Sequence, residues 1–400
     1  MSTAPDLLYS DEEEALRSAV RGLLGDHGGP SRVLAHAEDG RPYDRDLWAA
    51  LAEGMDLAGL LVPERLGGQG ATHREAAVAL EELGRSLAPV PFLTSAVIAT
   101  ETLLSCLCCP DTPATGPGHS SGGPDSTAEE LLRTLAAGAT VAVLAVPFTA
   151  GPGSPPATTV EERGGRLHGR VTSVAGAHAA DHLLVPTRTG LWAVDAAAAT
   201  LTPRTSLDVT RPLADVALDA APARLVAPHT PAADTPGDAA TSPAAAALDR
   251  GLSAGAGLLA SEQLGLAEWC LAETVRHTRE RHQFNRPLGS FQALKHRLAH
   301  VWLDTVHSRA AARNAADALA TATAAPDDET ALAVALAKSH CSATAVHAAE
   351  EALQLHGGTG MTWEHPLHLY LKRARADTLA LGSADRHLDR LAALTGLTMP

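Results

Sequence analysis

The chain is poor in aromatic residues and in positive charge, and both shortages limit what it can be. Phenylalanine, tyrosine and tryptophan make up only 3% of its 400 residues, so we expect a core of small aliphatic side chains on close-packed helices. The chain has 31 lysines and arginines but 46 aspartates and glutamates, which gives a formal net charge of -15. Nucleic acid is not an expected partner, because it binds a basic face, and any phosphate site must be locally basic.

Long apolar segments are also missing. The chain has no uninterrupted apolar run of about 18 residues, so the sequence predicts no membrane span. Its first residues, MSTAPDLLYSDEEEALRSAV, are acidic and contain no apolar stretch of the kind that signal peptides carry. We therefore expect a cytoplasmic protein, and the odd number of cysteines, five, favours free thiols there.

Groups of cysteine and histidine lack the spacing of a metal site. The cluster Cys106–Cys109 is too tightly spaced for a zinc knuckle and is typical of small buried residues at a helix end. His296, His300 and His307 recur on one expected helix, but no glutamate or further ligand follows at the right spacing. The sequence therefore predicts no metal.

The apolar pattern divides the chain into helical, β and helical parts, an α+β arrangement. Helical spacing predicts an amino-terminal helical domain over residues 1–138, with Ser10 as an N-cap and a capping box at Thr72–Glu75. Its expected helices cover 11–25, 44–56, 73–86, 91–107 and 127–137. Residues 110–125 are rich in proline, glycine and serine and predict a surface loop.

The second and third parts follow from a change of pattern near residue 139. Short runs rich in valine and leucine predict a small antiparallel β-barrel over residues 139–228, and the composition of 229–243 is typical of a linker. The expected strands are 141–148, 165–176, 181–188, 191–196 and 213–220. A helical bundle is predicted over 244–400, with helices at 245–282, 290–322, 328–356, 363–379 and 384–394.

Residues 279–298, RERHQFNRPLGSFQALKHRL, gather basic side chains in an otherwise acidic chain. Because a guanidinium donates two parallel hydrogen bonds to phosphate oxygens, the run fits a diphosphate site. It also fits a solvated helix face with ion pairs four residues apart, and composition alone favours that second interpretation.

Residues 354–374, QLHGGTGMTWEHPLHLYLKRA, contain a glycine-rich element. A helix that ends in glycines is ordinary C-cap chemistry. The element has no Walker lysine and follows no expected strand, which excludes a P-loop and a Rossmann turn.

Together these two segments resemble the carboxyl-terminal helical domain of the acyl-CoA dehydrogenase family, flavin enzymes that act on acyl thioesters. The resemblance is strongest over 262–383, moderate over 11–105 and weak in the β-domain, where Gly151-Pro152-Gly153-Ser154 is a degenerate copy of a family turn. It implies bound FAD, held across a subunit interface. The cofactor-binding residues it implies are Arg281, Gln283, Phe284, Leu288, Phe291, Gln354, Leu355, Gly357, Gly358 and Ser383.

The family's catalytic glutamate has no counterpart. It usually precedes a Gly-Thr or Gly-Ser pair and removes the α-proton of the thioester, and here Leu381 occupies that position. Some members carry the glutamate on the first long helix of this domain, where this chain has Gly255. Asp377 and Asp385 are the nearest acids in the sequence and the remaining candidates for a base.

The resemblance thus extends to the glutamate-lacking subunits of two-gene acyl-CoA dehydrogenases. It implies an FAD-dependent subunit for an acyl-CoA or acyl-carrier-protein thioester, working with a homologous glutamate-bearing partner or with itself as a dimer or tetramer. One alternative is a homo-oligomeric oxidase or monooxygenase that needs no α-proton base. Another is a flavin-free structural or binding subunit, which an absence of bound flavin would distinguish.

Overall fold

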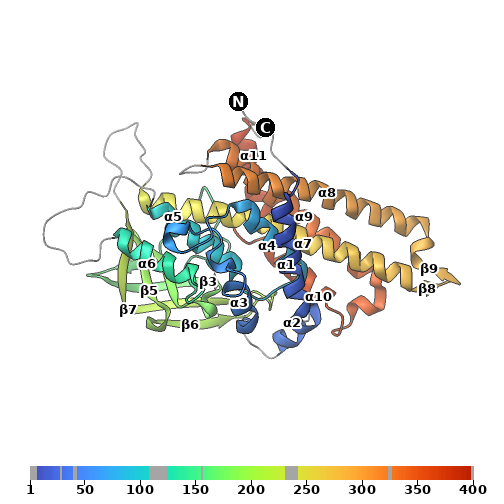
Figure 1. Ribbon diagram of the computed structural model, residues 1–400, viewed down its shortest axis with the longest axis horizontal. Coiled ribbons are helices and arrows are strands. Elements are labelled where there is room, and N and C mark those ends of the chain that lie inside the picture. Colours follow the sequence, from blue (N-terminus) through green and yellow to red (C-terminus); the bar gives the residue numbers. More distant parts are fainter. Residues whose placement is uncertain are drawn as a thin grey trace.

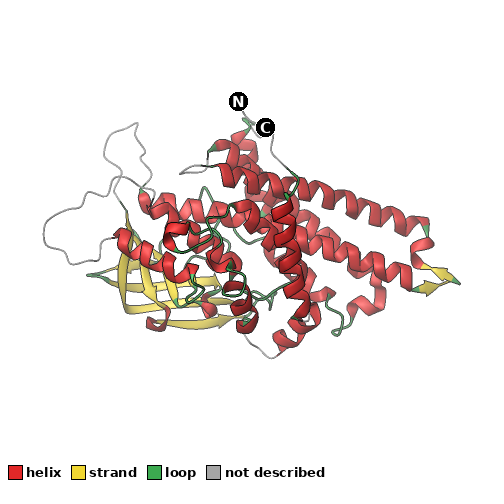
Figure 2. Ribbon diagram, viewed as in Figure 1, coloured by secondary structure: helices red, strands yellow, loops and turns green. Residues whose placement is uncertain are grey.

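The computed structural model describes residues 7–27, 29–38, 43–107, 124–154, 156–229, 242–322 and 327–397. Figure 1 shows a β-domain at one end, amino-terminal helices across the middle, and a bundle of long helices that extends to the other end. The strands gather at the first end, apart from a short hairpin at the opposite tip (Figure 2). The predicted order of helices, strands and helices is confirmed.

The amino-terminal helices begin at side chains that cap them. Ser10 and Glu13 form a capping box at the start of the first helix, and Thr72 and Glu75 form the predicted one at the start of the fourth. Each box satisfies N–H groups that a helix leaves unpaired in its first turn. The helices are α1 (Asp11–Asp26), α2 (Gly29–Glu38), α3 (Arg45–Ala52), α4 (His73–Ser86), α5 (Thr100–Leu107) and α6 (Pro124–Ala136).

Three of the expected features of this domain differ in the structure. Helix α2 lies where no helix is predicted, and α3 ends at Ala52, short of the expected residue 56. The expected helix 91–107 begins as an eight-residue π-helix, η3 (Phe92–Ala99), before it continues as α5. All of η3 is buried. Such segments are rare and often lie at functional sites.

The β-domain is a seven-stranded mixed sheet. Its strands follow the order β1-β4-β5-β7-β3-β2, with β6 also paired to β7. Only β1 runs parallel to its neighbour, β4, so the domain is not wholly antiparallel as expected. The strands are β1 (Ala142–Leu144), β2 (Val160–Glu162), β3 (Arg166–Ala175), β4 (His182–Pro186), β5 (Gly190–Asp195), β6 (Ala199–Arg204) and β7 (Leu213–Pro228).

The carboxyl-terminal bundle contains the longest helices. They are α7 (Pro243–Glu280), α8 (Gln292–Thr321), α9 (Asp328–His356), α10 (Leu367–Asp377) and α11 (Ala384–Leu394). A hairpin of β8 (His282–Gln283) and β9 (Arg286–Pro287), followed by the turn η6 (Leu288–Ser290), joins α7 to α8. A 3-10 turn, η7 (Gly357–Met361), follows α9.

Glycines let α7 cross α4 with backbones in contact. A Cβ atom at Gly84 would lie 2.1 Å from the carbonyl oxygen of Glu262, and one at Gly265 would lie 1.8 Å from that of Glu81. No side chain fits at either point, so this crossing fixes the amino-terminal helices on the bundle.

Other expectations concern smaller features. The predicted loop 110–125 and linker 229–243 lie almost wholly outside the described residues. Cys106, Cys270 and Cys341 are buried, and Cys270 and Cys341 are free thiols. Within the described ranges, no helix has both the length and the apolar character needed to cross a membrane.

Candidate functional site

Leu381, which the sequence analysis predicts to occupy the place of a catalytic glutamate, is held firmly by backbone hydrogen bonds. Its N–H donates to the carbonyl of Phe148 at 2.7 Å, and its carbonyl lies 2.9 Å from Nε2 of His387. Its φ is +53°, which is uncommon for a residue with a side chain. The leucine is 1% exposed, so the side chain points into the protein.

Gly255, the second position considered for a base, faces Leu381. A Cβ atom built on Gly255 would lie 3.1 Å from Cδ1 of Leu381 and 2.6 Å from Cγ1 of Ile98. The two positions are far apart in the sequence, yet the fold brings them together. Neither can accept a proton, and Ile98 on η3 fills the space that a larger residue at 255 would need.

The cavity beside Leu381 and Ile98 is small and apolar. Its volume is about 20 Å³, which holds about one water molecule. An acyl chain or an aromatic ring does not fit there. Thr94 supplies the one polar side chain in a lining formed by Thr94, Ile98, Val143, Leu144, Val146, Phe148, Ala175, Leu252 and Leu381.

The two neighbouring acids lie in different surroundings. Asp385 is exposed in the first turn of α11. Asp377 is 1% exposed, and its Oδ1 accepts a hydrogen bond from Arg211 at 2.8 Å. Burial raises the pKa of Asp377 although Arg211 opposes the shift, and its Oδ2 has no hydrogen-bond partner among the described residues.

Asp377 belongs to a buried ionic network. Arg373 donates to Asp208 and, at 2.6 Å, to Glu262, which also accepts from Arg211 at 2.6 Å. Burial opposes ionisation of Glu262, but the two arginines hold its pKa below the ordinary value. Lys338 donates to the backbone carbonyl of Asp377 at 2.9 Å. The network joins the β-domain to α7, α9 and α10.

A larger hollow opens on the other side of Leu381. It has a volume of about 340 Å³ and lies between the turn at Gly151–Ser154 and helix α11. Arg386 and Arg390 line it together with the acidic Asp389, and His387 forms part of its wall. Burial lowers the pKa of His387 to about 4, so this ring is neutral near pH 7. Ser383, one of the predicted cofactor contacts, caps α11 beside it.

The first predicted flavin segment forms the hairpin at the far tip of the bundle. Its two-residue turn is made by Phe284 and Asn285, whose φ values are both positive, as a type I′ turn requires. The Phe284 side chain is 86% exposed. Arg281 and Gln283 are also exposed, and Arg286 stacks on the ring of Phe291, 3.8 Å from its centroid.

The second predicted segment reaches the same end of the bundle. Gln354 is exposed and Leu355 is buried in the last turn of α9. Gly357 then adopts φ +58° and ψ -135°, a conformation open to glycine. A stack of His277 on His356, with ring centroids 4.2 Å apart, joins the two segments. Gly358 would meet no atom within 4 Å with a Cβ, so its backbone is open to an approaching ligand.

The predicted residues therefore form two groups at distant places. Leu381 packs among residues of β1 and β3, Gly255 lies against it, and Ser383 follows two residues later. Arg281 instead precedes the hairpin β8–β9, which Figure 1 shows at the opposite tip, and Gln354 belongs to the segment that the stack of His277 on His356 joins to it. Helix α7 runs unbroken from Gly255 to the residue before Arg281, a distance of about 40 Å at 1.5 Å per residue. One flavin dinucleotide is much shorter, so it cannot touch both groups in a single chain.

Several residues of the site carry no sequence signal. Phe148 and Ile98 lie in apolar runs that resemble any core segment, and His387 stands in an ordinary amphipathic helix. Arg211 precedes a proline in a loop. Its partner in the ionic network, Asp377, is far away in the sequence. Only the fold brings these side chains together.

Comparisons with known proteins agree with this architecture. The model of the acyl-CoA dehydrogenase carboxyl-terminal domain matches residues 245–395, and that of the amino-terminal domain matches residues 10–106. Acyl-CoA dehydrogenase IpdE2 of Mycobacterium tuberculosis is 34% identical over 382 residues, which cover 95% of this chain and 96% of the relative. Acyl-CoA dehydrogenase FadE34 of the same organism is 30% identical over 96% of this chain and 48% of its own length.

Two solved structures have the same fold. A variant of the Tcur3481-Tcur3483 steroid ACAD is 28% identical with a TM-score of 0.77, covering 96% of this chain and 98% of that one. The ChsE4-ChsE5 complex from Mycobacterium tuberculosis is 24% identical with a TM-score of 0.78, covering 99% of this chain and 100% of that one.

Proposed function

The chain belongs to the acyl-CoA dehydrogenase family, and from that premise we propose that it is a cytoplasmic subunit without its own catalytic base. Its residues contact the flavin of a homologous subunit, and that subunit carries the catalytic glutamate. The observation that supports this most directly is the pair Leu381 and Gly255, which pack directly against each other beside a cavity of only about 20 Å³ lined by Leu381. Both known places for the base are closed by apolar packing.

The tip of the bundle fits the diphosphate of FAD. Arg281 and the neighbouring Arg279 are exposed, and neither lies within ion-pair distance of a carboxylate in the described part of the chain. Free guanidinium groups and the open glycine backbone at 357–358 are what a diphosphate requires. The cavity beside Leu381, by contrast, does not fit the flavin ring. In this proposal, the chain holds the phosphate side of a cofactor whose ring lies in the partner.

In the family's chemistry, bound FAD accepts a hydride from the β-carbon of the thioester. This chain's own residues would bind and orient the cofactor: Arg281 through its guanidinium, Gln354 through its amide and Gly358 through its backbone N–H. The Leu381 side chain would keep water and any proton-accepting group out of the cavity in this subunit. The α-proton would go to a carboxylate of the partner subunit, because no such group lines the cavity here.

The relatives support a paired assembly acting on an acyl thioester. IpdE2 and FadE34 are named as acyl-CoA dehydrogenases, and the solved steroid ACAD carries a name that joins two components. We extend both properties to this chain. The hollow with Arg386 and Arg390 is a place where this subunit could meet the phosphates of CoA or of an acyl carrier protein.

We expect Arg281→Ala to lower the flavin content of the purified assembly and to weaken FAD binding about 10- to 100-fold, because a charge-assisted contact to phosphate is lost. Arg281→Lys should restore binding only in part, since lysine lacks the planar fork. The ratio of visible flavin absorption to protein measures the occupancy.

Arg276→Ala is the matched control for this experiment. Its guanidinium is one turn away but already paired with Glu273 and Glu280 of its own chain, so flavin content should stay unchanged. Full flavin occupancy in both Arg281 variants would show that this arginine does not hold the cofactor.

We also expect the chain to be an obligate oligomer, as a dimer or tetramer with itself or with the partner. The bundle exposes several large apolar side chains, and a subunit interface would cover such surface. These side chains are Phe284, Trp302, Leu303, Leu336, Met361 and Trp363. Light scattering at micromolar concentration should give the mass of two or more chains, and Leu303→Glu should lower it.

Leu207→Glu is the control for the oligomer, because Leu207 is similarly exposed but lies in the β-domain. Its mass should equal that of the wild type. A stable monomer for the unmodified chain would contradict the expectation, and so would an equal effect of both substitutions.

The leucine at position 381 is also compatible with an oxidase or monooxygenase, because such a reaction needs no α-proton base there. It would, however, need a flavin ring within this chain, where the cavity is about 20 Å³. We therefore favour the partner-subunit function.

A further inference from the structure

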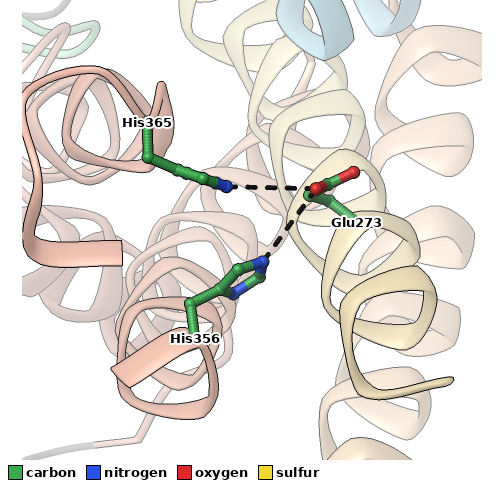
Figure 3. A group of neighbouring side chains, drawn as sticks. All are labelled: Glu273, His356 and His365. Atoms are coloured by element: carbon green, nitrogen blue, oxygen red, sulfur yellow. Dashed lines mark ion pairs between the residues drawn. The ribbon is translucent and has the colours of Figure 1, made fainter. Parts of the chain in front are cut away.

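Three potential metal ligands converge near the tip of the bundle (Figure 3). Glu273 comes from α7, His356 from the last turn of α9, and His365 from the segment between η7 and α10. Oε1 of Glu273 lies 4.0 Å from Nε2 of His356 and 4.0 Å from Nε2 of His365. The ligand atoms of all three residues lie within 4.8 Å of one another.

The hydrogen bonds of His356 leave a lone pair directed into this cluster. Its Nδ1 is 2.7 Å from the carbonyl oxygen of Ala352, which can only accept, so Nδ1 carries the proton. In the neutral ring, Nε2 is then an acceptor. The His356 side chain is fully buried, and Nε2 has no hydrogen-bond partner within the described residues. An imidazole lone pair therefore faces a carboxylate, an arrangement that a cation between them would stabilise.

The surroundings keep the imidazoles neutral. Burial is the main cause that lowers the pKa of His356 and of His365, and it also lowers that of the adjacent His277. Metal binding requires the unprotonated ring and the ionised carboxylate, and both are the forms present near pH 7. The pKa of Glu273 is held below its ordinary value by Arg276, against the effect of burial.

We propose that Glu273, His356 and His365 form a site for one divalent transition-metal ion of the zinc class. Two imidazole nitrogens and one carboxylate oxygen are a ligand set that binds Zn²⁺ and leaves a fourth position for water. Tetrahedral bonds of about 2.0–2.1 Å place ligand atoms about 3.3 Å apart. The present separations must shorten by less than about 1.5 Å, which small side-chain rotations achieve.

Two existing contacts compete with the ion, and both are weak. Arg276 forms a forked ion pair with Glu273, but it is half exposed and three residues away on the same helix, where such pairs contribute little. Its bond to Oε2 can persist while Oε1 binds the metal. The N–H of Leu367 donates to Nδ1 of His365 at 3.3 Å, and this long bond is lost when the His365 proton moves to Nδ1.

A metal at this place would act structurally. It would tie α7 to the end of α9 and to the segment that leads into α10, and so hold the turn at Gly357–Gly360 in place. The ligands come from three separate elements, so no spacing in the sequence indicates the site. The proposal does not depend on the partner-subunit function, because metal binding is measured without substrate or flavin turnover.

The test titrates Co²⁺ into the metal-stripped full-length assembly and follows visible d–d absorption, which is strong for four-coordinate cobalt. We expect one Co²⁺ per chain, displaced by one equivalent of Zn²⁺ and not by Mg²⁺. Glu273→Gln and His365→Gln should each lower the affinity at least 10-fold. Both residues are partly exposed, so these variants should fold, as circular dichroism will check.

The control removes the exposed histidine pair on α8 in a His296→Gln, His300→Gln double variant. Those side chains are four residues apart on a helix surface and could bind metal adventitiously. This variant should keep the cobalt spectrum. The proposal is overturned if wild type shows no four-coordinate spectrum, if the Glu273 and His365 variants keep it, or if only the α8 variant loses it.

Discussion

When the purified chain, free of any partner, is mixed without air with added FAD and a panel of acyl-CoAs, the flavin absorption is expected to stay unchanged. When a glutamate-bearing homologous subunit is added, the visible absorption band of the flavin should bleach during the same experiment. The physical reason is the absence of a base: loss of a general base typically slows proton transfer about 10²- to 10⁴-fold. A second readout, enoyl thioester formation with an artificial electron acceptor, should likewise require the partner.

The site makes this effect larger than a missing carboxylate alone. Leu381 and Ile98 close the space in front of Gly255, and the cavity beside them holds about one water molecule but no acyl chain, so the substrate cannot reach a replacement base there. We therefore expect Leu381→Glu to give no detectable bleaching by itself. A glutamate there would also be buried among apolar side chains, which raises the pKa of a carboxyl group and disfavours its charged form.

Rapid bleaching by the unmodified chain alone would mean that another residue removes the proton. Asp377 and Asp385 would be examined first, by replacing each with asparagine, and the partner-subunit proposal would be wrong. Weak activity in Leu381→Glu would instead show that the pocket opens for substrate. Asp377→Asn also removes an ionic contact with Arg211, so its flavin content and folding must be compared with wild type.

The sequence predicts an element of this fold well when the signal for that element is local, and poorly when the element depends on contacts between distant segments. Helices α7, α8 and α9 are predicted to within two residues at each end, because long helical periodicity and terminal breakers are local signals. Strands β2 and β6 are missed, since they are short or mostly exposed and lack the apolar alternation of a half-buried strand. The parallel pairing of β1 with β4 depends on contacts between distant segments.

The features of the candidate site also divide into those with a local sequence signal and those that depend on the fold. The motif around Arg281 and the leucine, rather than a glutamate, before Gly382-Ser383 are visible in the sequence alone. That Gly255 faces Leu381, and that the two flavin segments meet through His277 and His356, follows only from the fold. The hairpin turn at Phe284 is hidden because a phenylalanine with positive φ is not a residue that turn rules favour. Long-range packing, not local propensity, determines these features.

Arg373→Met is expected to destabilise the protein more than any other single change considered. Arg373 is 2% exposed and binds Asp208, Glu262 and the hydroxyl of Thr210. Its removal leaves the buried Asp208 without its cationic partner and Glu262 with Arg211 alone, and breaking such a network typically costs about 3–5 kcal/mol. The change in the urea unfolding midpoint, followed by circular dichroism, measures the loss. It should appear in the transition that separates the β-domain from the bundle, because the network joins the two.

The matched control is Arg375→Met, two residues along the same helix. Arg375 pairs with Glu350, but both side chains are about half exposed, and such surface pairs contribute about 0–1 kcal/mol. Arg373→Lys keeps the charge without the fork and should fall between the two. Equal midpoints for Arg373→Met and Arg375→Met would contradict the argument, because the difference rests on burial: water can solvate Glu350 once its partner is gone, whereas Asp208 and Glu262 remain enclosed.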